Sequence, residues 1–376
     1  MPEPGLALAL DSIVTGNTGS TRQAIEWAMG TAGTGRQIAM VYDWCRPSLT
    51  PLQSKALESK LSKAAQGGSE SVDAVRDRVF AAIALGDAQP DLAERTLKDV
   101  VVNWWRGQMA PKLESGALMI AGKDLYNLFE ILHVVRDNLN IDLRENATHF
   151  FGPLPGLYLL GHYPAPYPAA ENDYRIPAFK GPGDPDLDVA MFSRAAGLTM
   201  VAYDNNSTDS QFLQGWLMMD HFIMRHALGV PYEYLWANPY QPGLSYYHFP
   251  LSHHDPRSGG MFLRASWEDD ANWFGIVDGQ MQLYADGKIT LLNPKLKQAP
   301  LEFGAAMLVM AAEAAQFPVE TEKAGMIFVT GLERRSRYNV EVDDEEMWDT
   351  AADPAGTLAI PAAAGLKATV RVSRPR

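Results

Sequence analysis

The amino-acid sequence predicts an α+β multidomain protein in which a helical domain precedes a domain of antiparallel strands. Apolar residues recur at helical spacing through roughly the first 250 residues. At Gly260–Leu292 (GMFLRASWEDDANWFGIVDGQMQLYADGKITLL) the pattern changes abruptly to two-residue alternation, which is typical of strands. Such a change indicates two separate cores, and 376 residues are too many for one ordinary core. We therefore expect one domain over residues 1–255 and a second over residues 256–376.

Composition excludes several classes of protein. A hydrophobic content of 47% is enough for large cores and excludes global disorder. The net charge of −13, with no run of basic residues, argues against a nucleic-acid-binding protein, because phosphate neutralisation needs clustered Lys and Arg. The single cysteine, Cys45, excludes an intrachain disulfide and a zinc site built from several cysteines. No cofactor is expected.

The sequence contains no candidate membrane span, because no stretch reaches the roughly 20 apolar residues that a span requires. The N-terminal MPEPGLALALDSIV has a short apolar patch but no preceding basic segment and no clear cleavage site. It therefore does not have the pattern of a signal peptide. These observations leave localisation open between a cytoplasmic protein and the mature form of an exported one.

Amphipathic periodicity predicts the helices of the first domain in order. Gly30 is a plausible stop for the first of them, and Thr50 and Pro51 provide an N-cap and a first helical residue. Loops are expected at 66–69, over the turn-rich zone 140–188, which holds eight of the 25 prolines, and at 237–259. The expected helices are 21–29, 37–45, one from Pro51, 70–85, 91–109, 124–138, 185–203 and 208–228.

Alternation predicts the strands of the second domain. The segment Leu301–Gln316 is rich in Ala, so propensity favours a helix there, with strands as the alternative. The last strand pairs, with turns at Asp343-Asp344 and Ala363–Gly365, are expected to form a meander that closes a sandwich. The expected strands are 261–267, 271–277, 281–285, 288–292, 325–329, 338–342, 357–360 and 368–372.

The stretch Phe262–Trp267 (FLRASW), followed by Asp270-Ala271, resembles the opening strand of the sandwich in heparinase II/III-like polysaccharide lyases. The phrase Tyr42-Asp43-Trp44, followed by Leu49-Thr50-Pro51, is similar to toroid helices of that family. The resemblance implies an (α/α) toroid followed by a β-sandwich, and export to the periplasm or the outside. Periodicity indicates about ten helices, fewer than six pairs, so the ring is expected to be open or incomplete. Whether a partner copy in a homo-oligomer supplies missing helices is left open.

The resemblance also implies a chemistry, the β-elimination of an acidic, uronate-containing polysaccharide. The family usually places a His-x-His element in the early strands of the sandwich, whereas this chain has Gln280 and Gln282, followed by Asp286-Gly287. Amide oxygens are poor neutral substitutes for imidazole as zinc ligands. We therefore expect no structural zinc in the second domain.

A lyase of this kind needs a base, an acid and a donor that neutralises the sugar carboxylate. Two loops rich in Tyr, His and Arg, at 161–175 and 246–257, provide such groups, and we expect a cleft between the two domains lined by Tyr167, Tyr174, Arg175, Tyr247 and His253. The alternatives are a proline-rich surface loop and a solvated linker. The predicted catalytic residues are His162, Tyr167, Tyr174, Tyr247 and His253, and the predicted substrate-binding residues are Trp105, Asn127, Arg175 and Arg257.

Asn127 matches the neutralising Asn or His of the family, but a mid-helix Asn is as often a helix–helix hydrogen bonder. Two other functions remain open. One is a degenerate relative that binds glycans without turnover, which the glutamines at 280 and 282 favour. The other is a glycoside hydrolase on the same scaffold, which would need two opposed carboxylates that no spacing in the sequence selects.

Overall fold

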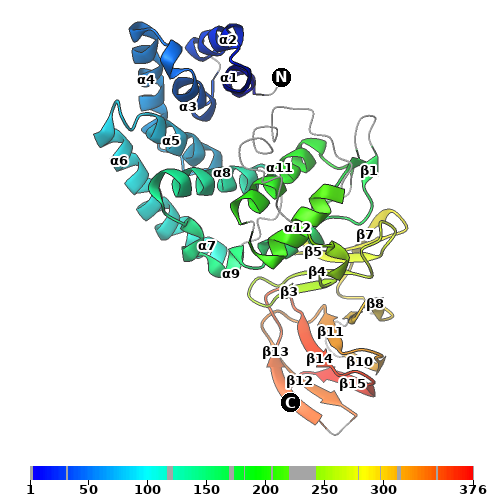
Figure 1. Cartoon of the computed structure of the whole chain (residues 1–376). Helices are drawn as coiled ribbons and strands as arrows, with labels where there is room; N and C mark the ends of the chain where they lie inside the picture. Colours follow the sequence, from blue (N-terminus) through cyan, green and yellow to red (C-terminus); the bar gives the residue numbers. More distant parts are fainter. Residues whose placement is uncertain are drawn as a thin grey trace. The chain divides into compact units, whose positions relative to one another are not determined.

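The computed structural model forms two compact units (Figure 1). It describes residues 3–30, 33–116, 122–168, 173–181, 183–204, 206–219, 243–277, 279–296, 298–310, 315–343 and 346–375. The helical unit comprises Met1–Glu114, Ala121–Gly152 and Asp188–Pro242, and the β-unit comprises Ser115–Ile120, Pro153–Leu187 and Gly243–Arg376. The order of a helical region followed by mainly antiparallel sheets confirms the predicted fold class.

The helices predicted from periodicity are present, and the N-terminal apolar patch forms a further helix, α1. In the described part of residues 20–140 there is no strand. The last predicted helix is described only as far as Met219. The helices are α1 (Pro4–Thr15), α2 (Thr18–Met29), α3 (Gly35–Trp44), α4 (Pro51–Ala65), α5 (Val72–Ala84), α6 (Pro90–Asp99), α7 (Ala110–Glu114), α8 (Gly122–Leu139), α9 (Thr148–Phe151), α11 (Leu187–Tyr203) and α12 (Thr208–Met219), with short 3₁₀ turns η1 (Arg46–Ser48) and η3 (Leu143–Asn146).

Local signals set the ends of the early helices as predicted. Thr50 caps α4 in a capping box: its hydroxyl accepts the Gln53 N–H, and the Gln53 side chain accepts the Thr50 N–H. Gly30 ends α2 in an extended conformation, and its N–H still donates to the carbonyls of Glu26 and Trp27. Between α6 and α7 the chain continues as a π-helix, η2 (Val100–Met109).

The first helices form two layers. In one, α3 packs against α1 and α5, and α5 packs against α8; in the other, α2 contacts α4 and α4 contacts α6. Burial follows the layers, since residues 125–135 of α8 are all buried whereas α4 buries only three residues. Alternation of inner and outer helices along the chain is the (α/α) pattern.

An ion network is buried in the inner layer. The guanidinium of Arg36 (α3) bonds to Glu130 (α8) at 2.6 Å, and Arg76 (α5) bonds to the other oxygen of Glu130 at 3.0 Å. Burial alone would lower the pKa of Arg36, but the Glu130 carboxylate beside it raises that pKa above its ordinary value. Because removal of one member would leave an uncompensated buried charge, the network fixes the register of these three helices.

The β-unit contains three larger sheets and a two-stranded ribbon (Figure 1). The sheet orders are β3-β4-β5-β6-β7, β14-β11-β9-β8 and β10-β15-β12-β13, and β1 pairs with β2. The unit also includes the helix α10 (Leu154–Leu160) and the 3₁₀ turn η4 (Tyr246–His248). The strands are β1 (Tyr167–Pro168), β2 (Asp173–Tyr174), β3 (Ser252–Asp255), β4 (Gly260–Arg264), β5 (Trp273–Val277), β6 (Gln280–Ala285), β7 (Lys288–Leu292), β8 (Leu301–Phe303), β9 (Ala306–Met310), β10 (Ala315–Glu320), β11 (Gly325–Thr330), β12 (Arg337–Val342), β13 (Glu346–Ala351), β14 (Leu358–Ala362) and β15 (Lys367–Ser373).

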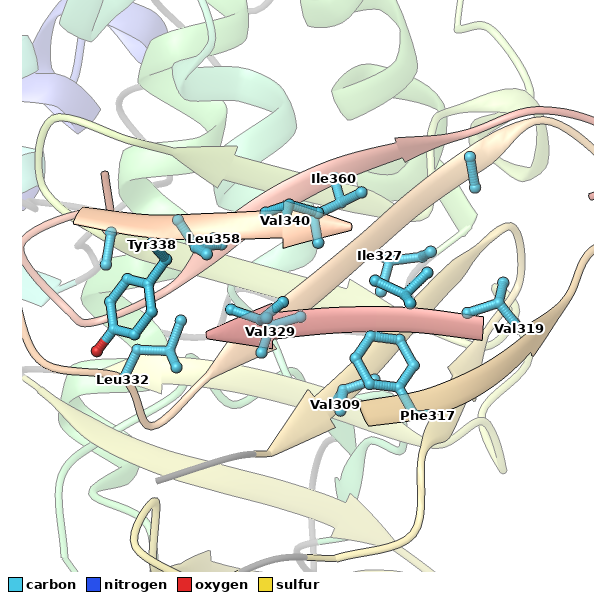
Figure 2. Packing of buried hydrophobic residues seen from close by; sticks show 14 residues of the cluster. Val309, Phe317, Val319, Ile327, Val329, Leu332, Tyr338, Val340, Leu358 and Ile360 are labelled. Atoms are coloured by element: carbon cyan, nitrogen blue, oxygen red, sulfur yellow. The ribbon is translucent and has the colours of Figure 1, made fainter. Parts of the chain in front are cut away.

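The larger sheets stack in three layers, with the β14-β11-β9-β8 sheet in the middle. Figure 2 shows one interface, where Ile327 and Val329 of β11 meet Tyr338 and Val340 of β12. On the other interface, Phe328 of β11 packs with Met261, Phe274 and other residues of the β3–β7 sheet. Successive residues of β11 thus face opposite cores, as the two-residue period of a strand requires.

Four sequence-based expectations for this unit are wrong. The zone 140–188, expected as loops, includes the helix α10 and the β1–β2 ribbon in its described part. Leu301–Gln316 is not a helix, since its described residues form β8, β9 and the start of β10. The neighbouring residues Leu308 and Val309 of β9 face two different cores. Burial on both sides of the strand overrides the helix propensity of Ala. Ala363–Gly365 joins β14 and β15, which belong to different sheets and are not a hairpin. The segment 237–259, expected as a loop, contains β3 and η4 in its described part.

Residues 153–187 and 243–255, which the sequence assigned to the first domain, belong to the β-unit in the structure. The indole of Trp273 provides one anchor: its Nε1 donates to the carbonyl of Leu160, the last residue of α10, at 2.7 Å. No helix among the described residues is both long enough and apolar enough to cross a membrane.

Gly275 provides the space that the Trp273 ring occupies. A Cβ atom at Gly275 would lie 2.3 Å from the Trp273 ring and 2.9 Å from Phe262. We expect Gly275→Ala to lower the free energy of unfolding by about 1–3 kcal/mol, as overpacking does. Equilibrium denaturation checks this, with Gly68→Ala, which meets no atom within 4 Å, as the control. In a double-mutant cycle, Trp273→Phe should reduce the cost of Gly275→Ala; strict additivity would contradict the steric cause.

Candidate functional site

The face of the β3–β7 sheet that lies away from the middle sheet carries polar and aromatic residues. Antiparallel register puts Arg264, Trp273 and Tyr284 in one row across β4, β5 and β6. A second row holds Phe262, Gly275 and Gln282. Directly paired residues project from the same face, and segment 153–187 covers this one. We call it the loop-covered face.

Tyr163 joins the covering segment to the sheet. Its ring stacks on Tyr284, with centroids 5.6 Å apart, and meets Trp273 edge-on at 5.1 Å. Its hydroxyl donates to Oε1 of Gln282 at 2.7 Å. Burial raises the pKa of Tyr163 to about 12, and burial also raises the pKa of Tyr284. Both hydroxyls are therefore protonated at neutral pH, and that of Tyr163 is the donor to Gln282.

Gln280 and Gln282 fix the backbone of the same segment. Nε2 of Gln282 donates to the carbonyl of Phe179 at 2.7 Å and to Oε1 of Gln280 at 3.3 Å. Oε1 of Gln280 also accepts the N–H of Gly181 at 3.0 Å. At the positions where the resembled family has His-x-His, this chain therefore has an amide clamp, defined by these two side chains, which holds residues 179–181 against β6.

A cavity of about 660 Å³ lies between the clamped segment and the β6–β7 hairpin. Its lining combines aromatic rings with proline, glycine and aliphatic residues. Asp184 is the one carboxylate and Lys288 the one cation among the described lining residues, and both are exposed. The rings are those of Tyr163, Tyr167, Phe179 and Tyr284.

Several residues predicted from the sequence lie at or beside this cavity. Tyr167 lines it and is 38% exposed. Tyr174 is the register partner of Tyr167, so the two side chains project from the same face of the β1–β2 ribbon. The next residue, Arg175, donates to the carbonyl of Pro164 at 2.8 Å and to Asp269 at 2.9 Å.

Tyr247 belongs to an aromatic cluster near Arg175. It stacks on Tyr246, with centroids 4.7 Å apart, and Tyr246 meets Trp267 edge-on at 5.6 Å. Arg264 lies over the Trp267 ring at 4.6 Å. Electrostatic interactions of Tyr246 with both Arg175 and Asp269 put this cluster beside the β1–β2 ribbon.

The other predicted residues of the β-unit lie elsewhere. His162 is 1% exposed, and its Nδ1 bonds to the Tyr158 carbonyl at 2.6 Å, which ties it to the end of α10. His253 lies on β3 in the same cross-strand row as Gln282, so it belongs to the loop-covered face, but it is three strands away, or roughly 14 Å at ordinary strand spacing. Burial lowers the pKa of His253. Arg257 bonds to Asp255 at 3.0 Å within the β3–β4 turn.

Asn127 and Trp105 lie in the core of the helical unit. Nε1 of Trp105 donates to the Leu143 carbonyl at 2.8 Å, and the whole side chain is buried. Asn127 is also buried, and its Oδ1 accepts from Arg76 beside the ion network. These contacts match the helix–helix alternative for Asn127, so neither residue enters the site proposed below.

The sequence-based set missed Tyr163, Tyr284, Lys288 and Asp184. Tyr284 has the same strand parity as Gln280 and Gln282, so alternation already put all three on one face. Tyr163 was part of the Tyr-rich loop, but no pattern distinguished it from Tyr167. In the described ranges, no three His, Cys, Asp or Glu side chains are grouped so that they could hold a metal ion.

No family model matches the sequence, and no curated protein matches it. Among solved structures, the chain is similar to one described as a glycoside hydrolase, with a TM-score of 0.36 and 9% sequence identity, over 99% of this chain and 71% of that chain. A likeness this distant assigns no activity.

We expect Gln282→Leu to destabilise the β-unit and to loosen the cavity wall. The change leaves the Tyr163 hydroxyl and the Phe179 carbonyl without this partner in a buried region, at a cost of about 1–3 kcal/mol for each group. Thermal and denaturant unfolding measure the loss. Gln316→Leu, an exposed position on β10, is the matched control, and an equal effect of the two changes would contradict the clamp.

The amide clamp also leads us to expect no zinc in the β-unit. Both amides already bond to protein groups, and neutral amides are weak zinc ligands. Elemental analysis of protein prepared without chelators should give zinc far below one equivalent. Near-stoichiometric zinc that is lost together with either glutamine would overturn this prediction.

Proposed function

We propose that this protein binds an acidic polysaccharide in the cavity of the β-unit and cleaves it by β-elimination. The observation that carries the proposal is the chemistry of the cavity lining. Its described residues include tyrosines, one lysine and a single carboxylate. Tyrosine rings offer flat apolar faces to sugar rings and hydroxyls to their polar edges. A lysine offers a positive charge to a uronate carboxylate.

The reaction assigns a role to each group. A base removes the proton on the carbon next to the carboxylate, a double bond forms to the neighbouring carbon, and the glycosidic oxygen on that carbon leaves with a proton. Tyr167 is the candidate base and acid, because it is the most exposed tyrosine of the lining. Lys288 is the candidate neutraliser of the carboxylate. Tyr163 and Tyr284 stay protonated, and Tyr163 holds the cavity wall through its bond to Gln282.

A glycoside hydrolase is a weaker interpretation of the same cavity. Hydrolysis of a glycosidic bond generally uses two carboxyl groups on opposite sides of the bond. The described lining holds only Asp184, which is exposed. Asp269 is bonded to Arg175 and does not belong to the described lining.

The second candidate function is glycan binding without turnover. It is favoured by the amide clamp, because Gln280 and Gln282 carry no group that transfers protons at neutral pH. The two candidates predict the same ligand and differ only in whether a product forms.

Tyr167→Phe separates these functions. We expect the protein to produce an unsaturated uronide, followed by its ultraviolet absorbance, from at least one of alginate, glucuronan, heparinoid and pectic substrates. The variant keeps the ring but loses the hydroxyl, so the rate should fall by roughly 10²-fold or more while binding is retained. Tyr42→Phe, which removes a hydroxyl bonded to Glu58 in the helical unit, is the control.

Each other outcome has a definite meaning. Binding without unsaturated product in the wild-type protein contradicts the lyase and supports the second candidate. New reducing ends without the absorbance would indicate a hydrolase. No binding of any of these polysaccharides would overturn the proposed function as a whole.

A further inference from the structure

We infer that the cavity receives an O-acetyl group carried by the acidic sugar, with the Tyr284 hydroxyl donating to its ester carbonyl and aliphatic side chains of β7 contacting its methyl group. This inference rests on the proposed function and specifies which form of an acidic polysaccharide the protein selects. Three observations carry it. The cavity lining is mainly apolar, its buried hydroxyls are mostly used by the protein itself, and aliphatic residues share a sheet face with Tyr284.

The cavity lining is poor in polar side chains. Of its 15 described residues, three tyrosines, Asp184 and Lys288 carry a polar side-chain atom, and the other ten carry none. Asp184, Lys288 and Tyr167 are exposed, whereas Tyr163 and Tyr284 are only 4% and 7% exposed. The charged groups of the described lining are thus at exposed positions, where a sugar carboxylate would meet them. A ligand group that contacts the buried part of the lining finds few hydrogen-bond partners there.

The second observation is that the two buried tyrosines use most of their hydrogen-bonding capacity within the protein. The Tyr163 hydroxyl donates to Oε1 of Gln282 at 2.7 Å and accepts the N–H of Phe179 at 3.4 Å. The backbone of Ala165 hydrogen-bonds to the Tyr284 hydroxyl. Because this bond lowers the pKa of Tyr284, the hydroxyl oxygen is the acceptor in it. A phenolic hydroxyl also has one proton to donate, so Tyr284 can offer that proton to a ligand.

The third observation is that the aliphatic part of the lining adjoins Tyr284. Ile289 is the register partner of Tyr284, and Leu291 is the register partner of Gln282, so all four side chains project from the loop-covered face. The next residue, Leu292, packs with the core on the other side of the sheet, as strand alternation requires. Leu291 is 43% exposed although it is a large apolar residue. A ring with a hydroxyl and two aliphatic side chains therefore line the cavity side by side.

An O-acetyl group matches this set of groups. Its ester carbonyl accepts a hydrogen bond, its methyl group gains from apolar contact, and it has no proton to donate. A free sugar hydroxyl or an N-acetyl group would bring an O–H or N–H donor that loses its bond to water in this part of the cavity. A methyl ester of the uronate would supply apolar surface but would remove the charge that Lys288 is proposed to bind. The acetyl group is therefore expected on a hydroxyl of the sugar.

Matched polysaccharides test this preference. Alginate, glucuronan and polygalacturonate are each compared with a chemically O-acetylated preparation of the same polymer, and the dissociation constants are measured by calorimetry. We expect the wild-type protein to bind the acetylated form of its ligand roughly tenfold more tightly, because burial of a methyl group and a hydrogen bond to the carbonyl act together. Conversion of the carboxylates to methyl esters should instead weaken binding.

Two substitutions connect the preference to the lining. Tyr284→Phe keeps the ring but removes the proposed donor, and Leu291→Thr replaces an aliphatic side chain by a polar one that still favours a strand. Each should reduce the ratio of acetylated to parent affinity by roughly threefold or more. A ratio measured on one variant is insensitive to a general loss of stability. Leu296→Thr, at a 58% exposed leucine outside the described lining, is the matched control and should leave the ratio unchanged.

The outcomes separate this inference from the proposed function. Equal binding of acetylated and parent polysaccharides by the wild-type protein overturns the acetyl site and leaves the proposed function standing. Equal weakening of both forms by Tyr284→Phe and by Leu291→Thr also overturns it, as does tighter binding of the methyl ester than of the acetylated form. If the wild-type protein binds neither form of any of these polymers, the acetyl site falls together with the proposed function.

Discussion

The candidate site depends on one constraint, which is that the β3–β7 sheet must be covered on both faces. One face is buried by the middle sheet of the β-unit. The other carries Trp273, Gln282 and Tyr284, which would expose large rings and a buried amide if segment 153–187 did not pack there. Gly275 makes this packing sterically possible, because the Trp273 ring occupies the place of its missing side chain. The cavity is the part of this interface that the covering segment does not fill.

The amide clamp holds its loop by direct hydrogen bonds between protein groups. A zinc ion fixes its ligands by strong directional bonds, and second-sphere hydrogen bonds then orient them. Here Gln282 bonds directly to the Tyr163 hydroxyl and the Phe179 carbonyl, and Gln280 bonds to the Gly181 N–H. Each bond contributes only about 1 kcal/mol net, but loss of one partner leaves the other buried and unsatisfied.

Local patterns predicted most of the fold but only part of the site. Periodicity located the helices and the strands from Gly260 to Leu292, because these signals lie within a few neighbouring residues. The strands at Leu301–Gln316 were missed because their burial comes from two other sheets, which a propensity scale does not contain. For the candidate site, the sequence pointed to the Tyr-rich loop, and Tyr167 of that loop lines the cavity. Tyr284, which lines the same cavity, is 117 positions away in the sequence, and no local pattern relates the two residues.

Two of the described histidines connect parts of the β-unit. His162 closes the end of α10 onto a carbonyl, and His254 bonds to Asp353 at 2.8 Å between β3 and a later turn. The charged and hydroxyl groups of the described cavity lining are the tyrosine hydroxyls, Lys288 and the exposed Asp184. The acidic ligand proposed above has the same sign of charge as the whole chain, whose net charge is −13, so its binding would depend on short-range contacts, because the long-range interaction is repulsive. Binding should therefore strengthen when added salt screens the general repulsion, until the local pairs are themselves screened.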